Sequence, residues 1–446
     1  MTSRRNFISK TLLGTAAVTM SNPLMGMSAE SYRRIIGAND RLNVAIAGLG
    51  RRVGAFYPPI AKKEANARLL YLCDVMKSQR ERALKNVSEH LDYTPKTEND
   101  IRKVLDDKKV DILINATPDH WHTPGSVMAM QAGKHVYVEK PCSHNMNENE
   151  LLVQAAGKYD KVVQMGNQQR SSQHTTKIIT EIHNGAIGTP YKAVAFYTNS
   201  RGEVPVQKSA PVPDGLDWEL WQGPAVRRAY TDNTWDYNWH WYGWNYGTAE
   251  AGNNATHELD VARWALGVDY PHYAETEGAK RHFEKDGWEM YDTMLATFKF
   301  KDNKIIQWDG KSRNGYDTYG AGRGTIVYGS EGSVFMDRGQ YRRYDRAGKL
   351  VDSFDSNNNE AGTALGGGGS LTTAHMINFF DTIRGKAKLT APIDDASISM
   401  AMVHYTNIAY RTGKGFSIDE NTGRIYDREA MQLWGRTYAP GWEPKI

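Results

Sequence analysis

Short apolar runs that stop abruptly at polar residues recur through the first third of the chain. A near-continuous apolar run such as 110–116 is typical of a strand buried on both faces of a parallel sheet. The stretches between the runs leave room for helices. This alternation predicts an α/β arrangement in which ligands bind beyond the carboxyl ends of the strands. The runs occupy residues 43–47, 69–73, 110–116 and 135–138.

The chain is too long for this unit alone. A single hydrophobic core stops growing well below 446 residues, so we expect two main domains. We assign residues 38–165 to the first domain and residues 166–446 to the second. The second mixes predicted strands at 191–199 and 291–300 with predicted helices near 174–184, 254–266 and 371–384.

Composition excludes several classes of protein. The charge balance is 55 basic against 51 acidic residues, a net charge of +4, and it shows no basic footprint for nucleic acid. No apolar run approaches the roughly 20 residues of a membrane-spanning helix, so we expect no integral membrane segment. Two cysteines, Cys73 and Cys142, are too few for a disulfide scaffold or a cysteine-rich metal site.

The first 30 residues read as a targeting segment. Arg4 and Arg5 precede a mildly apolar stretch at 11–20, which is the pattern of a twin-arginine signal. Such a signal directs export of an already folded protein, so we expect a periplasmic protein. The alternative is a disordered basic tail.

A glycine-rich turn follows the first apolar run. Residues 48–54 read Gly-Leu-Gly-Arg-Arg-Val-Gly, which lets a helix start approach a pyrophosphate with its backbone N–H groups. The dinucleotide fingerprint places its third glycine at 53, but here Gly54 comes one residue late. The second run ends in Asp74. Its carboxylate would accept hydrogen bonds from ribose hydroxyls and repel a 2′-phosphate. We therefore favour NAD over NADP.

Two later motifs resemble a known family. They are Ala-Thr-Pro-Asp-His-Trp-His at 116–122 and Gly-Lys-His-Val-Tyr-Val-Glu-Lys-Pro at 133–141. From about residue 40 to about 415 the sequence is similar to the glucose-fructose oxidoreductase and inositol dehydrogenase family, Gfo/Idh/MocA. The resemblance implies an N-terminal Rossmann domain and a C-terminal α+β domain with an open, mostly antiparallel sheet. It also implies a homo-oligomer, a dimer or tetramer, formed through that sheet.

The second motif singles out Lys140. In the family the following proline is usually cis, and the lysine points at the junction of nicotinamide and substrate. An ammonium there would stabilise developing alkoxide charge, and burial would lower its pKa. The alternative is a surface lysine after a strand. The expected cofactor-binding residues are Gly48, Gly50, Arg51, Arg52, Asp74, Thr117, Pro118, His120, His122, Glu139, Lys140 and Gln168.

In the second domain, a helix beginning near Asn253 or Asn254 would place His257, Asp260 and Trp264 on one face. The family has a catalytic histidine at the position of His257 and usually an aspartate where this chain has Asn253. An amide cannot relay a proton, so Lys140 and His257 must divide the acid–base work. The expected substrate residues are Arg170, Trp239, Trp241, Asn253, His257 and Asp260. Gln168 and Arg170 could instead belong to a polar linker.

Aromatic residues crowd the approach to His257. Six of the twelve tryptophans fall between residues 218 and 244. Aromatic faces stack on sugar rings, so we expect one or two of them to line a carbohydrate site and at least half to be core or interface residues.

His240, His257 and Glu258 lack the spacing of a zinc motif, so we expect no metal. The tetraglycine at 366–369 suggests a mobile loop, a lid or a plain linker.

These features lead to three hypotheses for function. The first is an NAD-dependent oxidoreductase that moves hydride between a carbohydrate or polyol and nicotinamide. The second is a glycoside-cleaving enzyme that oxidises ring C3 transiently, eliminates the glycosidic group and recycles its cofactor. The third is a non-catalytic dehydrogenase-like binder. Because the periplasm offers little free NAD, we expect a tightly bound cofactor.

Overall fold

The computed structural model describes residues 40–356 and 369–446. The predicted twin-arginine segment at 1–30 and most of the tetraglycine, Gly366 to Gly368, lie outside the described residues. The part from Leu42 to Ile446 forms one compact unit.

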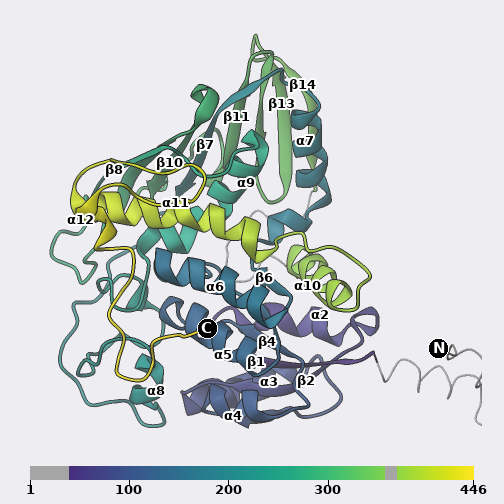
Figure 1. The fold of residues 1–446 in the computed structure, drawn as a ribbon, viewed down its shortest axis with the longest axis vertical. Helices are drawn as coiled ribbons and strands as arrows, with labels where there is room; N and C mark the ends of the chain where they lie inside the picture. The colour runs from purple at the N-terminus through teal and green to yellow at the C-terminus, as the bar shows by residue number, and fades with distance from the viewer. Residues whose placement is uncertain (1–39, 357–368) are drawn as a thin grey trace, which may run out of the picture. The chain divides into compact units, whose positions relative to one another are not determined.

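The first sheet is parallel and six-stranded, as the apolar runs predicted (Figure 1). The strand order reverses between β1 and β4, so the carboxyl ends of these strands flank the point where ligands bind in such sheets. The order is β3 (Lys96–Glu98), β2 (Ala67–Cys73), β1 (Leu42–Ala47), β4 (Ile112–Asn115), β5 (His135–Val138) and β6 (Val163–Met165). The connecting helices are η2 (Val53–Phe56), α2 (Tyr57–Ala61), η3 (Lys63–Ala65), α3 (Lys77–Val87), α4 (Ile101–Asp106), α5 (Asp119–Gln131) and α6 (Met146–Tyr159).

The second sheet has nine strands, and all neighbouring strands run antiparallel except one parallel pair, β7 and β10. Along β9 the side chains of Met294, Ala296 and Phe298 are buried, while Leu295 between them is 43% exposed. This alternation means that one face is covered and the other is open. The order is β14 (Leu350–Asp355), β13 (Gln340–Asp345), β12 (Gly332–Met336), β11 (Arg323–Gly329), β7 (Pro190–Thr198), β10 (Ile305–Lys311), β9 (Thr293–Lys299), β8 (Tyr273–Ala279) and β15 (Phe416–Ser417).

Helices from the second half cover the buried face and reach the first sheet. Helix α9 contacts β7 and β11, and α11 contacts β8 as well as α6 and β6, so α11 joins the two sheets (Figure 1). The predicted α/β fold with an open, mostly antiparallel second sheet is confirmed. The helices and helical turns of this half are η4 (Gln168–Ser171), α7 (Gln173–His183), α8 (Trp218–Gln222), η5 (Asn238–His240), η6 (Ala251–Ala255), α9 (Thr256–Leu266), η7 (Lys301–Asn303), α10 (Gly369–Ile383), α11 (Ile393–Thr412) and α12 (Arg428–Met431).

The C-terminal segment returns to the first sheet's helices. Arg436 pairs with the buried carboxylate of Glu148 in α6 at 2.7 Å and donates a hydrogen bond to the carbonyl of His120. Tyr438 donates to the same carboxylate at 2.9 Å. The last residues of the chain thus stabilise the nucleotide-binding half rather than the sheet that precedes them.

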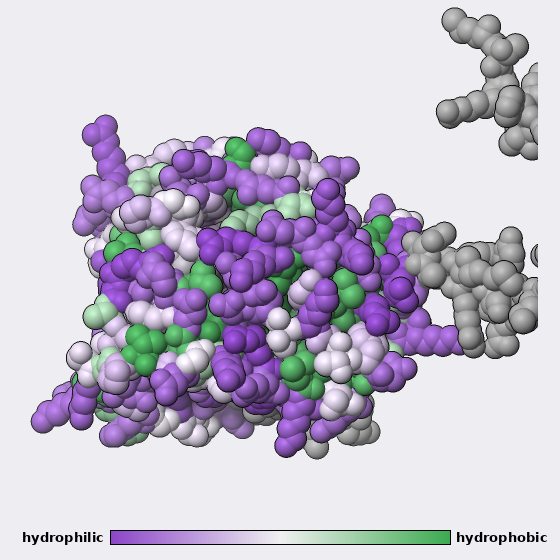
Figure 2. Space-filling view, turned by 90° about the horizontal axis from the view of Figure 1, so that it is seen from below, coloured by the Kyte–Doolittle hydropathy of each residue, from purple (hydrophilic) through white to green (hydrophobic). Residues whose placement is uncertain are grey.

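The loop-rich stretch between β7 and η6 packs against the end of β2. The backbone N–H of Asp217 donates to the carbonyl of Val75, and Trp221 and Trp239 share a hydrophobic cluster with Met76. This stretch therefore forms a wall beside the carboxyl end of the parallel sheet. The face in Figure 2 is mainly hydrophilic, with hydrophobic side chains scattered over it. None of the helices in the described part of the chain is long and apolar enough to cross a membrane.

Candidate active site

A cavity of about 680 Å³ opens where the two halves meet. Its size lies in the range of roughly 300–1,000 Å³ that is usual for cofactor and ligand sites. One wall consists of the carboxyl ends of β1, β2, β4 and β5, as the sequence predicted. The other wall comes from the second half, at residues 197–201, 235–240, 253–257, 320–323 and 337–340.

The glycine turn is shaped by a close backbone approach. Gly48 has φ +87°, and a Cβ atom at this position would lie 2.3 Å from the carbonyl oxygen of Ala116. Only glycine satisfies both constraints. The space beside Gly50 is open, since nothing lies within 4 Å of a Cβ built there. An open turn at the start of a helix, between two strand ends, fits the pyrophosphate of a dinucleotide.

Asp74 lies at the end of β2 and lines the same part of the cavity. Its carboxylate accepts hydrogen bonds from the backbone N–H groups of Leu49 at 2.7 Å and Met76 at 2.8 Å. Burial raises the pKa of Asp74 although these donors oppose the shift. Arg80 and Arg82 donate to the backbone carbonyls of Asp74 and Leu49. The residues of the turn are therefore fixed before a ligand arrives.

Arg52 and Glu139 form an ion pair across the cavity wall, with Nε and Oε1 2.8 Å apart. Burial alone would raise the pKa of Glu139, but the charges of Arg52 and Lys140 lower it below its usual value. Gln168 donates to the hydroxyl of Tyr137 and lies within 3.5 Å of Glu139. These contacts hold the Glu-Lys-Pro turn in place, and its Lys140–Pro141 peptide bond is cis, as the family resemblance implied.

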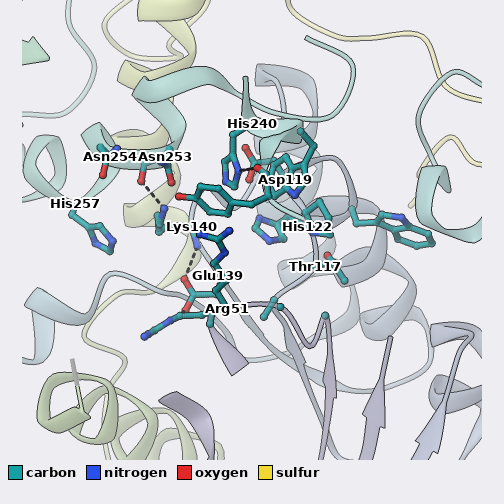
Figure 3. A pocket seen from close by; sticks show the side chains of 18 of the residues that line it. Arg51, Thr117, Asp119, His122, Glu139, Lys140, His240, Asn253, Asn254 and His257 are labelled. Atoms are coloured by element: carbon teal, nitrogen blue, oxygen red, sulfur yellow. Dashed lines mark hydrogen bonds and ion pairs between the residues drawn. The ribbon is translucent and has the colours of Figure 1, made fainter. Parts of the chain in front are cut away.

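Lys140 lies in the middle of the labelled group in Figure 3, with His257 on one side and Asp119 and His122 on the other. Its Nζ donates a hydrogen bond of 2.6 Å to the backbone carbonyl of Asn253. Burial lowers the pKa of Lys140, although the charges of Glu139 and Asp119 act in the opposite direction. The main chain of Asn253, not its amide, thus holds the ammonium group.

His257 follows the π-helical turn η6, one residue into α9. The helical turn begins at Ala251, slightly earlier than predicted, and π-turns often mark functional sites. The imidazole lines the cavity, and no hydrogen bond joins it to any described residue. Burial, followed by the charges of Arg338 and Lys140, lowers its pKa well below the usual value. A neutral imidazole that faces the cavity can accept a hydrogen bond from a bound hydroxyl through one ring nitrogen, or donate one through the other.

Asp119 and His240 are among the polar residues that line this part of the cavity and were not predicted as site residues. Asp119 accepts from the backbone N–H and the hydroxyl of Thr248 at 3.1 and 2.6 Å, and burial raises its pKa. The Nδ1–H of His240 donates to the carbonyl of Tyr237, and burial lowers the pKa of His240 well below the usual value. The signal for Asp119 was present, because it stands at a strand end inside the Thr-Pro-Asp-His-Trp-His motif.

The structure brings most of the predicted residues to the cavity. Of those expected to bind cofactor, all line it except His120, and of those expected to bind substrate, half line it. The lining residues are Gly48, Gly50, Arg51, Arg52, Asp74, Thr117, Pro118, His122, Glu139, Lys140, Gln168, Trp239, Asn253 and His257.

His120 does not reach the cavity. Its Nε2 lies 2.9 Å from the carbonyl of Trp221, and its ring packs between Trp221 and Tyr246. Successive helical residues point about 100° apart, so Asp119 and His122 face the cavity while His120 faces the loop wall. Burial lowers the pKa of His120 to about 3, so it is a neutral structural residue.

Arg170 and Asp260 bind each other instead of a substrate. The guanidinium makes two hydrogen bonds of 2.8 Å to the carboxylate, and Ser399 donates a third. Asp260 lies one turn beyond His257, about 4.5 Å along the helix axis, which carries it past the cavity. We correct their role to that of a buried pair joining η4 to α9. Gln168 lines the cavity and Arg170 does not.

The six tryptophans between 218 and 244 divide between cavity and core, with three at the cavity where one or two were expected at a carbohydrate site. Trp221, Trp235 and Trp239 line the cavity. Trp241, which we expected to contact substrate, stacks on Trp288 with ring centroids 4.1 Å apart and is only 1% exposed. Its role is therefore corrected to a core residue. Among the described residues no group of three histidine, cysteine or acidic side chains is arranged to hold a metal ion.

Comparison with known proteins agrees with this geometry. Residues 42–167 match "Oxidoreductase family, NAD-binding Rossmann fold", and residues 225–417 match "Oxidoreductase family, C-terminal alpha/beta domain". Over 296 residues the chain is 23% identical to the myo-inositol 2-dehydrogenase of Thermotoga maritima, covering 66% of this chain and 75% of that protein. It is 24% identical over 254 residues to the alpha-N-acetylgalactosaminidase of Tannerella forsythia, covering 52% of each.

Among solved structures, a levoglucosan dehydrogenase in complex with NADH and levoglucosan superimposes with a TM-score of 0.64 at 18% identity. The match covers 84% of this chain and 99% of that chain, which shows a shared fold. The two family matches together span more than half of the protein, on either side of the cavity they enclose. The chain belongs to the Gfo/Idh/MocA family of NAD-binding oxidoreductases.

Proposed function

We propose that the protein is an NAD-dependent oxidoreductase that acts on a hydroxyl group of a carbohydrate or polyol. The observation that carries this proposal is the position of Lys140 beside His257, at the meeting point of the strand-end wall and the second half. The sugar dehydrogenases among its relatives support the substrate class. When bound, the nicotinamide would accept or return the hydride.

The chain's own residues would handle the proton of the reacting hydroxyl. Lys140 has a lowered pKa and a fixed hydrogen bond to the main chain, so its Nζ can exchange a proton without losing its position. His257 presents a neutral ring to the same space and would orient the hydroxyl. The carboxylate of Asp119, anchored by Thr248, lies on the other side of Lys140 and favours its charged form.

We propose NAD rather than NADP, and tight retention of the cofactor. Asp74 supports the choice of NAD, because a carboxylate at the end of β2 repels a 2′-phosphate. The loop-rich stretch between β7 and η6 supports retention, since its Trp221 and Trp235 line the cavity that also contains Gly48 and Asp74. Denaturing the purified protein and weighing the released nucleotide by mass spectrometry tests both points. Release of NADP would contradict the role of Asp74.

A glycoside-cleaving activity is the second candidate. It is favoured by the similarity to an alpha-N-acetylgalactosaminidase, and the same cavity residues would serve it. Incubating the purified protein with sugars, polyols and aryl glycosides separates the two. A dehydrogenase would change the absorbance of the reduced nicotinamide without releasing aglycone. Release of aglycone with no net change in the cofactor would identify a glycosidase, and neither signal would point to a non-catalytic binder.

Three further expectations remain proposals. They are export to the periplasm through the segment at 1–30, assembly as a dimer or tetramer through the open face of the second sheet, and a domain boundary at residues 165 and 166. The exposed Leu295 on the open face supports the second of these. Light scattering of the purified protein would test the assembly, and cell fractionation would test the export.

A further inference from the structure

The guanidinium of Arg338 at the cavity forms no ion pair with any residue of 40–356 or 369–446. Arg338 lies in the turn between β12 and β13 and lines the cavity on the wall of the second half. Its Nη2 atom is buried without a hydrogen-bond partner, and no ion pair joins Arg338 to any described residue. A buried charge without a partner is costly, so its persistence calls for a ligand that supplies the partner.

The acidic groups near Arg338 along this wall already have hydrogen-bond partners of their own. Arg323 binds Glu258 through two hydrogen bonds of 2.7 and 2.9 Å. Arg52 is paired with Glu139. The neighbouring carboxylate of Asp337 accepts from the backbone N–H groups of residues 339 and 340 and from the side chain of Gln340. Within the described residues no carboxylate forms an ion pair with Arg338, and that of the adjacent Asp337 is bonded to neutral donors of its own turn.

Arg338 lies at the reacting end of the cavity. Its positive charge lowers the pKa of His257, second only to burial, and it also lowers the pKa of Lys140. The charges that act on Arg338 itself are those of Arg323, Glu258 and Arg52. Burial, with the charge of Arg323, lowers the pKa of Arg338 to about 9, although the charge of Glu258 opposes this shift.

We propose that Arg338 binds the carboxylate of an acidic sugar, such as a uronic or aldonic acid, and so sets the substrate class of this site. This inference rests on the proposed oxidation of a carbohydrate. A planar guanidinium matches a carboxylate with two parallel hydrogen bonds. One unpaired cation balances one negative charge, whereas a phosphate monoester would bring about two. A neutral sugar would leave the buried Nη2 of Arg338 without a charged partner.

The test compares matched sugars on the cofactor-loaded protein. Titration calorimetry would measure the dissociation constants of glucose and glucuronate, and of galactose and galacturonate, with glucose 6-phosphate as the phosphate probe. We expect each acid to bind roughly tenfold to a hundredfold more tightly than its neutral partner, as for a hydrogen bond to a charged group. Arg338→Met should abolish this difference in affinity between acid and neutral sugar, and Arg338→Lys should keep part of it. The exposed Arg346→Met should leave the difference unchanged.

Each outcome decides the inference. Acids that bind no more tightly than neutral sugars would overturn it, as would a preference for glucose 6-phosphate. If Arg338→Met instead lowered the nucleotide content of the purified protein and left the sugar preference intact, the partner of Arg338 would be the cofactor. Failure of the proposed oxidation would look different, because acids would then still bind preferentially while no sugar changed the absorbance of the cofactor. Retained nucleotide content and circular dichroism show that the variants are folded.

Discussion

The two ends of the cavity differ in how far their polar groups are matched within the protein. At the turn end, the carboxylate of Asp74 accepts two backbone N–H groups, and Arg82 donates to the backbone of Leu49. At the reacting end, His257 and the Nη2 of Arg338 have no hydrogen-bond partner among the described residues.

This difference separates binding from chemistry. A turn whose polar groups are already hydrogen-bonded within the protein keeps its shape with or without a ligand. It can therefore present a rigid binding site to a cofactor that is the same in every catalytic cycle. Groups without partners carry a cost in free energy that a substrate can relieve, so they provide specificity and act on a reacting hydroxyl. Substitutions at the reacting end should therefore change turnover, and substitutions at the turn end should change stability and cofactor content.

The largest effect is expected at Lys140. Lys140→Met keeps the length of the side chain but removes the group that exchanges a proton, so kcat/KM should fall by roughly 10³-fold to 10⁴-fold. The nucleotide content should not change, because the turn end is intact. The control is Lys158→Met on the exposed face of α6. Turnover that survived Lys140→Met would remove this residue from the mechanism.

A smaller loss is expected when two histidines are compared. His257→Gln should lower kcat/KM by about a hundredfold with little change in melting temperature, since its ring faces the cavity. His120→Gln should lower the melting temperature and leave kcat nearly intact, because that ring binds the carbonyl of Trp221. Steady-state kinetics and thermal unfolding of both variants check the contrast. The reverse pattern would mean that the two histidines have been assigned the wrong way round.

At the turn end the expected change is in stability. Gly48→Ala forces a side chain into a left-handed backbone and against the carbonyl of Ala116, at a cost of about 3 kcal/mol in the free energy of unfolding. The protein should also retain less nucleotide. Gly157→Ala is the matched control, because this glycine lies in α6 with open space around it, and alanine there should stabilise by up to about 1 kcal/mol. Denaturant unfolding measures both.

The smallest effect expected is a slope in the pH profile. Burial lowers the pKa of Lys140 from 10.5, so the neutral amine that accepts the hydroxyl proton accumulates at pH values below that figure. As pH rises toward the lowered pKa, kcat/KM for oxidation should increase up to tenfold per pH unit and then level off. The reverse reduction needs the protonated amine, so it should stay level below the lowered pKa and decline above it. Lys140→Arg, which stays charged, should abolish the slope.

The sequence was most informative where structure is local. The ends of β1, β2, β4 and β5 were visible as apolar runs that stop at polar residues, and the topology of a parallel sheet brings such ends together. That is why residues as distant as Gly48, Asp74 and Lys140 were assigned to one site. The turn at Gly48 was equally predictable from the sequence, since the close approach of its backbone to Ala116 permits only glycine.

The helical spacing of residues was less informative about which side chains would pair with one another. The three-residue step from His257 to Asp260 indicated a shared helix face, but it could not show that Arg170 covers one end of that face. Arg338 carried no signal at all, because only the order of strands in the second sheet brings its turn beside His257. The predicted substrate contact of Trp241 was wrong for a related reason, since its stacking partner, Trp288, lies on a separate loop.

The returning C-terminal segment has a consequence for the order of synthesis. Arg436 and Tyr438 reach Glu148 across 288 and 290 residues, so helix α6 leaves the ribosome long before its carboxylate can be neutralised. Contacts of such long range slow folding. The nucleotide-binding half, although made first, gains these two contacts only from the end of the described chain, and trimming the chain after α12 would leave the buried carboxylate of Glu148 without them.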